Sequence, residues 1–256
     1  MKILVTGNLG YIGSVLTDIL FDKGIDFVGY DTGYFENCLL HKIEKNFNQI
    51  KKDIRDIKNN DLKDISAIIH LSALSNDPLG EFNSKITKEI NFDATINLAT
   101  LAKKNGVKRF IYISSQSMYG VADTNSELDE YESEKNPVTE YAKTKWQAEL
   151  ELNKLSNKEF SVVSFRPSTV FGVSPRLRCD IVFNNLVASA FTTGKIEIKS
   201  DGSPWRPVVH VRDVCSAILA GLKAPIELIE GKAFNVGIEN GNYTVKKLAE
   251  VVNDAV

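Results

Sequence analysis

The sequence has few cysteines and histidines, and this scarcity excludes two classes of site. Its three cysteines and three histidines lie far apart, and no Cys-x-x-Cys pair occurs. A disulfide framework and a structural zinc site both need ligands at closer, regular spacings. We therefore predict neither disulfides nor a metal centre.

The chain also lacks an excess of one charge and a long apolar run. Lys and Arg total 31 against 33 Asp and Glu, a net charge of −2, so no general positive field attracts nucleic acid or an anionic membrane. The longest stretch without charge, Ile3 to Thr17, contains three glycines, whereas a membrane span needs roughly 20 mostly apolar residues. The first residues are too short an apolar run for a signal peptide. These absences predict no nucleic-acid or membrane partner, and the cytoplasm as default location.

Short apolar runs alternate with helical patterns along the first two thirds of the chain. The runs are rich in β-branched residues, as expected of strands buried on both faces. Their alternation with helices predicts an α/β fold of the Rossmann type, with a doubly wound parallel sheet. The predicted strands are Lys2–Thr6, Asp26–Tyr30, Ala67–Leu71, Phe110–Ser114 and Phe160–Phe165, and the predicted helices are Tyr11–Lys23, Ile90–Asn105 and Glu140–Leu155.

The rhythm changes after about Pro167, where longer loops appear. We predict a nucleotide-binding domain over residues 1–166 and a smaller C-terminal substrate lobe over residues 167–256, partly interleaved with it. The chain ends inside an amphipathic pattern, which predicts that residues completing this lobe are missing. Its predicted elements are the helices Ile181–Thr193, Val211–Leu222 and Val245–Ala255 and a strand at Lys195–Lys199.

A glycine motif joins the first predicted strand to the first helix. It reads Val5-Thr6-Gly7-Asn8-Leu9-Gly10-Tyr11-Ile12-Gly13. Gly7 suits a tight turn, Gly10 lets the backbone approach a pyrophosphate, and Gly13 lets the helix pack closely on the strand. The free N–H groups at the helix N-terminus favour phosphate. The motif therefore predicts a dinucleotide site.

An acidic residue follows the second strand, as ribose recognition requires. The carboxylate of Asp31 can accept hydrogen bonds from a ribose diol; the alternative is a plain turn residue before Thr32-Gly33. No Arg or Lys stands beside Asn8, Leu9 or Thr32 to pair with a 2′-phosphate. We therefore predict NAD rather than NADP.

The Gly-x-x-Gly-x-x-Gly spacing resembles that of the extended short-chain dehydrogenase/reductase family, of the NAD-dependent nucleotide-sugar epimerase/dehydratase type. Asp53-Ile54-Arg55, His70-Leu71-Ser72-Ala73 and the helix segment Asn91–Leu98 resemble further motifs of that family. The resemblance implies a set of NAD contacts along the whole chain. These are Gly7, Asn8, Leu9, Gly10, Tyr11, Ile12, Gly13, Asp31, Asp53, Ile54, Leu71, Ser72, Ala73, Asn91, Tyr141, Lys145 and Pro167.

A Tyr-x-x-x-Lys pair carries the predicted chemistry. The i, i+4 spacing puts Tyr141 and Lys145 on one face of a predicted helix, where the ammonium group favours the phenolate form of a base. The pair alone is common, but Ser114-Ser115-Gln116-Ser117 stands upstream at a strand end, where doubly wound sheets bind ligands. The resemblance implies that Ser115, Tyr141 and Lys145 are catalytic and that Ser115 binds the reacting sugar oxygen.

Two later motifs resemble the family's substrate side. In Arg166-Pro167-Ser168-Thr169-Val170-Phe171-Gly172, the proline would lie near the nicotinamide, and Thr169 replaces the usual Asn. In the segment Asp201–Val214, the resemblance implies that Arg206 holds the nucleotide diphosphate; the alternative is a surface ion pair. His210 is expected to cap the next helix. The predicted substrate contacts are Ser115, Ser117, Tyr141, Thr169, Asn185 and Arg206.

The resemblance implies an NAD-dependent oxidoreductase or epimerase that acts on a nucleotide-activated sugar through a keto-sugar intermediate, with 4-epimerisation expected first. The 4,6-dehydratases of the family carry an Asp-Glu pair after the catalytic Ser or Thr, whereas Gln116-Ser117 stands here, so dehydration is disfavoured. A dehydrogenase or ketoreductase with the same triad, and a non-catalytic NAD-binding scaffold, stay open.

Two further expectations concern the surface. The family commonly forms dimers through two helices, here Ile90–Asn105 and Glu140–Leu155, and their apolar spacing allows a homodimer. The acidic stretch Glu127–Lys135 is interpreted as a solvated loop before the tyrosine helix.

Overall fold

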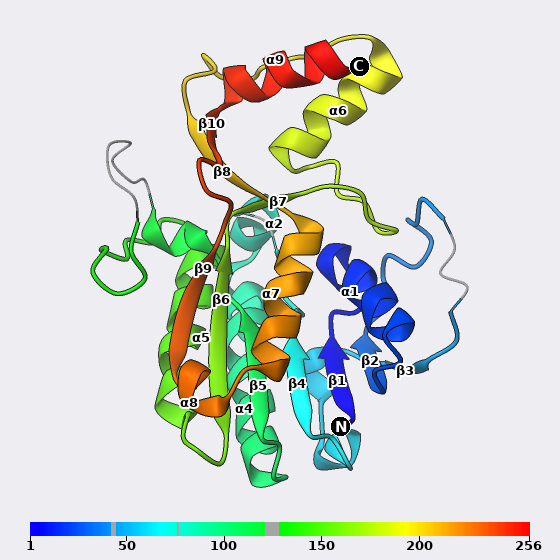
Figure 1. Ribbon diagram of the computed structural model, residues 1–256, viewed down its shortest axis with the longest axis vertical. Helices are drawn as coiled ribbons and strands as arrows, with labels where there is room; N and C mark the ends of the chain where they lie inside the picture. The colour runs from blue at the N-terminus through cyan, green and yellow to red at the C-terminus, as the bar shows by residue number, and fades with distance from the viewer. Residues whose placement is uncertain (42–44, 76, 121–127) are drawn as a thin grey trace.

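A seven-stranded sheet forms the centre of the computed structural model, which describes residues 1–41, 45–75, 77–120 and 128–256. All its strands are parallel and follow the order β3-β2-β1-β4-β5-β6-β9 (Figure 1). The chain direction across the sheet reverses between β1 and β4, which is where such sheets bind ligands. The predicted α/β fold is confirmed. The strands are β1 (Ile3–Thr6), β2 (Phe27–Asp31), β3 (Asn48–Lys51), β4 (Ala67–His70), β5 (Arg109–Ile113), β6 (Ser161–Pro167) and β9 (Lys232–Val236).

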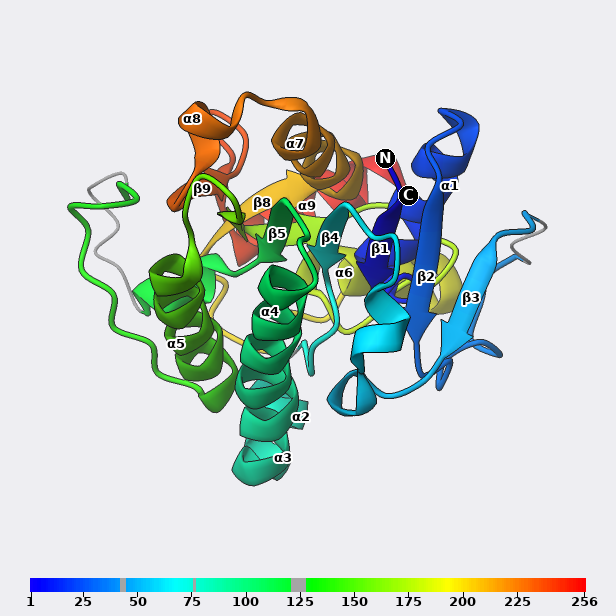
Figure 2. The same cartoon turned by 90° about the horizontal axis from the view of Figure 1, so that it is seen from below.

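Helices cover both faces of this sheet (Figure 2). One face packs on α1 (Tyr11–Asp22) and α7 (Val211–Lys223), and the other on α4 (Ala94–Lys104) and α5 (Glu140–Leu155). Strand side chains alternate between the two cores, as the pleat requires. Thus Ile3 belongs to the first core and Leu4 to the second, and both are fully buried. The strands read as continuous apolar runs because both of their faces are covered.

Short helical segments connect the main elements. The predicted helix Ile90–Asn105 is a longer run in the structure, in which α3 (Ser84–Lys88) and a π-helical turn, η3 (Glu89–Asp93), lead into α4. The remaining short segments are α2 (Asp77–Phe82), α8 (Ile226–Ile229), and the 3₁₀ turns η1 (Ile54–Asp56), η2 (Asn59–Leu62) and η4 (Gln116–Tyr119).

A small three-stranded sheet lies beyond the C-terminal edge of the large one (Figure 1). Its order is β10-β8-β7, with β7 parallel and β10 antiparallel to β8. The helices α6 and α9 pack against each other above it. The chain also comes back to the large sheet, where β9 pairs with β6 and α7 packs on one face. The division predicted at residue 166 stays a prediction. The elements of this lobe are β7 (Thr169–Phe171), α6 (Val182–Thr193), β8 (Trp205–His210), β10 (Asn242–Thr244) and α9 (Val245–Ala255).

The strand predicted at Lys195–Lys199 was wrong. No strand forms there, although Ile196 and Ile198 do turn toward a core, packing beside Leu186 and Leu248. The apolar alternation therefore serves packing, because no neighbouring strand offers its hydrogen bonds to this segment. In the part of the chain that the structure describes, no helix combines the length and apolar character needed to cross a bilayer.

Candidate active site

The three glycines of the motif between β1 and α1 play different structural parts. Gly7 has a φ of +72°, and a Cβ there would stand 2.7 Å from the Ser72 nitrogen. A Cβ on Gly13 would overlap the Gly7 carbonyl and lie 2.7 Å from the Asn8 Cα. At Gly10 a Cβ would meet only the Gly7 carbonyl, at 3.2 Å. Packing therefore requires Gly7 and Gly13, whereas Gly10 leaves open the space in front of the helix N-terminus.

This difference predicts opposite outcomes for two alanine substitutions. Gly13→Ala should destabilise the fold by roughly 1–3 kcal/mol, the usual cost of overpacking, because backbone atoms surround the new methyl group. Gly10→Ala should change stability by less than about 1 kcal/mol, since the φ of −81° at this position suits alanine. The same substitution should weaken NAD binding at least roughly tenfold, because the new methyl group would obstruct the pyrophosphate. Urea unfolding and calorimetry measure the two effects. Equal stability losses for the two variants would contradict this assignment.

Asp31 lies directly beside the glycine loop. Its carboxylate accepts hydrogen bonds from the backbone nitrogens of Leu9, at 3.2 Å, and Gly33, at 2.9 Å. The residue thus fixes its own turn, as the alternative interpretation held, and also stands at the loop where a ribose would lie. The half-buried segment that follows β4 borders the same loop, since Ser72 faces Gly7. The structure therefore brings together the glycine loop, Asp31 and residues Leu71, Ser72 and Ala73.

The structure also places a lysine near Asp31 that the sequence did not reveal. Lys51 on β3 pairs with Asp31 in register, and its amine would lie 3.4 Å from a Cβ on Gly33. The amine is bound by Glu36, with both oxygens at 2.8 Å. Its charge is therefore already paired.

We accordingly expect NAD to bind at least roughly tenfold more tightly than NADP, because a 2′-phosphate would meet the Asp31 charge while the nearby Lys51 amine is already bound by Glu36. Glu36→Gln should narrow the difference, since it releases Lys51 to pair with the phosphate. Calorimetric titrations with both cofactors test this, and equal dissociation constants for the unmodified protein would refute it.

Other predicted cofactor residues are engaged by the protein itself. The carboxylate of Asp53 accepts hydrogen bonds from the guanidinium of Arg55 and from its backbone nitrogen, and these bonds, the guanidinium's first, lower the pKa of Asp53. Asn91 is buried, and its amide bonds both backbone groups of Leu74 at 2.8 and 3.1 Å. Asn91 thus shapes the loop after β4. Direct NAD contacts by Asp53, its neighbour Ile54, and Asn91 stay predictions.

The predicted catalytic residues come from η4 and α5, which pack against each other at the end of β5. Ser115 is the N-cap of η4, and its hydroxyl lies 2.7 Å from that of Ser117. Tyr141 is half-buried in the first turn of α5, and Thr139 caps this helix. Lys145 lies one turn further on and donates to the carbonyl of Ile113, two residues before Ser115, at 2.7 Å. The structure thus joins the α5 face to the strand end that carries Ser115.

Burial sets the charge state of this end of β5. Lys145 is 4% exposed, and desolvation lowers the pKa of its amine from 10.5 to about 7. His70 is buried with its ring nitrogens 2.7 Å from the Thr6 hydroxyl and 2.8 Å from that of Thr95. Burial first, and Lys145 second, lower the pKa of His70 to about 3. His70 is therefore neutral, and Lys145 can change its charge near neutral pH.

The predicted substrate residues are more dispersed. Thr169 on β7 and Arg206 on β8 share the small sheet, and Arg206 is exposed, with a hydrogen bond from its guanidinium to the Trp205 carbonyl at 3.0 Å. Among the described residues, Arg206 forms no ion pair, so the surface-pair alternative gains no support. Asn185 on α6 is exposed and donates to the Cys179 carbonyl at 2.9 Å. Contacts of these residues with a sugar nucleotide stay predictions.

One helix cap and two long-range hydrogen bonds stand where the small lobe meets the large sheet. His210 accepts a hydrogen bond from the Arg212 nitrogen at 3.3 Å, which confirms its predicted role as a helix cap. The Tyr11 hydroxyl donates to the Gly172 carbonyl at 2.7 Å, and the buried Ser14 hydroxyl lies 2.9 Å from that of Ser174. The first turn of α1 is therefore tied to the segment after β7, a connection with no local signal in the sequence.

The residues present fit a dinucleotide. Besides the open space at Gly10, the buried hydroxyls of Ser114 and Ser168 have no hydrogen-bond partner among the described residues. Ser168 directly follows Pro167, the predicted neighbour of the nicotinamide, so an amide-bearing ring would find a polar group there. Among the residues outside the gaps at 42–44, 76 and 121–127, no three His, Cys, Asp or Glu side chains gather as a metal site would need.

The main residues that the sequence analysis missed are Glu149 and Tyr119, the partners of Arg166. Arg166 and Glu149 form a buried ion pair, and Arg166 also donates to Tyr119. The sequence held one signal, since Glu149 follows Lys145 by four residues and so shares its helix face. The sequence gave no sign that the partner of Glu149 would be Arg166 on β6.

Comparison with protein families gives a match over most of the chain. The model of the NAD dependent epimerase/dehydratase family matches residues 3–237. UDP-glucuronic acid decarboxylase 4 of Arabidopsis thaliana is 28% identical over 100% of this chain and 57% of its own length. UDP-glucose 4-epimerase of Mycolicibacterium smegmatis is 32% identical over 93% of this chain and 77% of its own length. The chain thus spans little more than half the length of the plant decarboxylase.

Solved structures share the fold. The structure of MoeE5 in complex with UDP-glucose and NAD superposes with a TM-score of 0.86 at 27% identity, covering 100% of this chain and 82% of that chain. The match extends over the large sheet and the small lobe alike, since all of this chain is covered.

Proposed function

The chain belongs to the NAD dependent epimerase/dehydratase family, whose cofactor is NAD, and on this premise we propose that it is a nucleotide-sugar epimerase that acts at C4 through a keto-sugar. One observation carries the proposal. Lys145 is anchored on Ile113 at the end of β5, so that the face of α5 bearing Tyr141 stands beside the turn that Ser115 begins. This contact supports an arrangement in which Tyr141 as base, Lys145 as cation and Ser115 as hydroxyl donor act together at the ligand-binding edge of the sheet.

Each side chain then has a defined part. Tyr141 removes the proton of the sugar hydroxyl as general base, and Ser115 donates a hydrogen bond to the same oxygen. Lys145 stabilises the phenolate and binds the ribose next to the nicotinamide. NAD, when bound, supplies the hydride acceptor for the sugar carbon. The glycine loop, Asp31 and Pro167 would hold the dinucleotide, and Arg206 would pair with the sugar nucleotide's diphosphate.

The residues after Ser115 favour epimerisation over dehydration. Dehydration must also move protons at C5 and C6, which calls for an acid and a base beside the catalytic hydroxyl. Gln116 and Ser117 stand at those positions, and the Ser117 hydroxyl is bound to that of Ser115. Neither side chain titrates near neutral pH, so the C6 hydroxyl should stay on the product.

Product analysis tests the proposal. The protein would be incubated with NAD and, separately, UDP-glucose, UDP-galactose, UDP-N-acetylglucosamine and UDP-glucuronic acid. We expect a stereoisomer of unchanged mass from at least one of them, with no net gain of reduced cofactor. A 4-keto-6-deoxy sugar would identify a dehydratase, released carbon dioxide a decarboxylase, and stoichiometric reduced cofactor a dehydrogenase. If the protein binds NAD but converts none of these sugar nucleotides, the non-catalytic NAD-binding scaffold is the remaining interpretation.

We also expect the protein to form a homodimer through α4 and α5. These helices lie side by side on one face (Figure 2), and Leu150 on α5 is 43% exposed. Paired copies would bury this face as a four-helix bundle. Light scattering at micromolar concentration should give twice the chain mass. Leu150→Lys should halve it, whereas Val251→Lys, at 44% exposure on α9, should not. A monomer in the unmodified protein would refute the prediction.

A further inference from the structure

A buried ion pair joins α5 to the large sheet. The guanidinium of Arg166 on β6 binds the carboxylate of Glu149 on α5, with Nε 3.1 and 3.2 Å from the two oxygens and Nη2 2.5 Å from Oε1. Both side chains are nearly fully buried, at 3% and 7% exposure. The rings of Trp146 and Tyr119 lie against the guanidinium.

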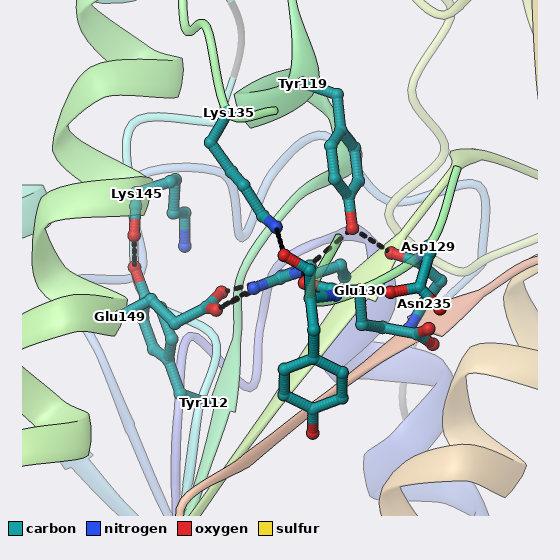
Figure 3. Close-up of polar contacts among 10 residues, drawn as sticks. Tyr112, Tyr119, Asp129, Glu130, Lys135, Lys145, Glu149 and Asn235 are labelled. Carbon is teal, nitrogen blue, oxygen red and sulfur yellow. Dashed lines mark hydrogen bonds and ion pairs between the residues drawn. The ribbon is translucent and has the colours of Figure 1, made fainter. Parts of the chain in front are cut away.

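The other nitrogen of Arg166 reaches two further segments. Nη1 donates to the Tyr119 hydroxyl at 2.7 Å and to the Glu130 carbonyl at 2.8 Å. Tyr119 in turn donates to the side-chain oxygen of Asn235 on β9 at 2.8 Å, and the Glu130 carboxylate accepts from the Asn235 nitrogen. Figure 3 shows Glu149, Tyr119, Glu130 and Asn235 converging on one centre.

The interpretation of the acidic stretch as a solvated loop was therefore wrong at Glu130; Glu127 lies outside the described residues.

The partners of Arg166 sit next to the predicted catalytic residues in the chain. Glu149 lies one helical turn after Lys145 on α5. Tyr119 is the last residue of η4, the turn that Ser115 caps. Arg166 therefore holds, from one guanidinium, the helix that carries the base and the turn that carries the hydroxyl donor.

Neither ligand binding nor stability alone explains this cluster. A cavity beside it is lined by Lys135, Trp146 and the ion pair, but Arg166 already uses Nε and Nη1 and one N–H of Nη2 within the protein. A buried ion pair is also a weak source of stability, because desolvation offsets most of the attraction. What the cluster supplies is a fixed geometry, since a guanidinium donates in rigid directions.

We propose that Arg166, Glu149 and Tyr119 are positioning residues that set the spacing between Ser115 and the Tyr141–Lys145 face of α5. The proposal rests on the proposed function, because it takes those three residues as the reacting groups. It assigns the cluster no contact with sugar or cofactor. Its loss should therefore lower the rate of the chemical step and leave both ligand affinities unchanged.

Tyr119→Phe is the sharpest test, because it removes one hydroxyl and keeps the ring that packs on Arg166. With UDP-glucose and NAD as probes, we expect kcat to fall roughly 10- to 100-fold, the size of effect that a small misplacement produces. The KM for UDP-glucose and the NAD dissociation constant should stay within about twofold. Glu149→Gln should act in the same direction, and Glu151→Gln, which breaks the surface pair of Glu151 with Lys154 on the same helix, should leave kcat unchanged. A role in stability alone would lower the melting temperature of Tyr119→Phe but not its kcat.

Hydrogen exchange gives a readout that needs no activity. In Tyr119→Phe, the amides of Met118, Tyr119 and Gly120 should exchange at least roughly tenfold faster, because η4 loses its tie to Arg166. Those of β1 and β4 should be unchanged. If the unmodified protein turns over none of the probes, the proposed function fails, and exchange alone decides the positioning proposal. Unchanged exchange in η4, or an unchanged kcat in an active protein, overturns it.

Discussion

Replacing Tyr141 with phenylalanine is expected to lower turnover by about 10²–10⁴-fold, the usual contribution of a positioned general base. The substitution removes only the phenolic oxygen, and the Cβ and backbone of Tyr141, which lie against Gly80 in the first turn of α5, are unchanged. The fold and the affinity for NAD should therefore persist. Turnover of the responding sugar nucleotide, thermal unfolding and NAD calorimetry measure the three properties separately.

Two companions sharpen this prediction. Tyr131→Phe changes an exposed tyrosine and should leave turnover unaltered. Lys145→Met should impair both NAD affinity and rate, and its effect on the rate should not add to that of Tyr141→Phe, because the two residues act as a unit. Near-normal turnover in Tyr141→Phe would place the base elsewhere and overturn the site assignment.

Lys145→Met is expected to stabilise the NAD-free protein while it removes activity. Burying the ammonium group is unfavourable, which is why the pKa of Lys145 falls to about 7. Below that pH the amine is charged in both folded and unfolded chains, so the full cost of burial is present. Between about 7 and 10.5 the unfolded chain binds a proton that the folded chain does not, so the stability of the unmodified protein rises with pH.

The stabilisation by Lys145→Met should therefore be largest at acidic pH and shrink as the pH rises. Its upper limit is about 5 kcal/mol, the free-energy equivalent of moving a pKa from 10.5 to about 7. Urea unfolding at about pH 6 and about pH 9 measures the difference. Lys143→Met is the matched control, since Lys143 is exposed and paired with Glu140. A stability difference that is the same at both values of pH would contradict the burial argument.

Much of the fold could be predicted because its signals are local. A strand covered on both faces must be apolar throughout, so the five predicted strands agree with the structure to within two residues at either end. The failures are segments whose state depends on a distant partner. The edge strand β3 is exposed and polar, and β9 joins the sheet only because β6 offers it a free edge.

In the predicted site, too, the features that could be predicted are local, and those that could not depend on a distant partner. By itself, the sequence determined the glycine loop, the acidic end of β2 and the position of Tyr141 one helical turn before Lys145 on α5, because each depends on a local pattern along the chain. Only the tertiary structure decided that Glu149 pairs with Arg166, that Asn91 binds Leu74 and that Lys51 lies near Asp31 but is held by Glu36. These contacts join residues from different elements, and a hydrogen bond or ion pair between them is fixed by strand order and helix packing. No local pattern in the chain records that information.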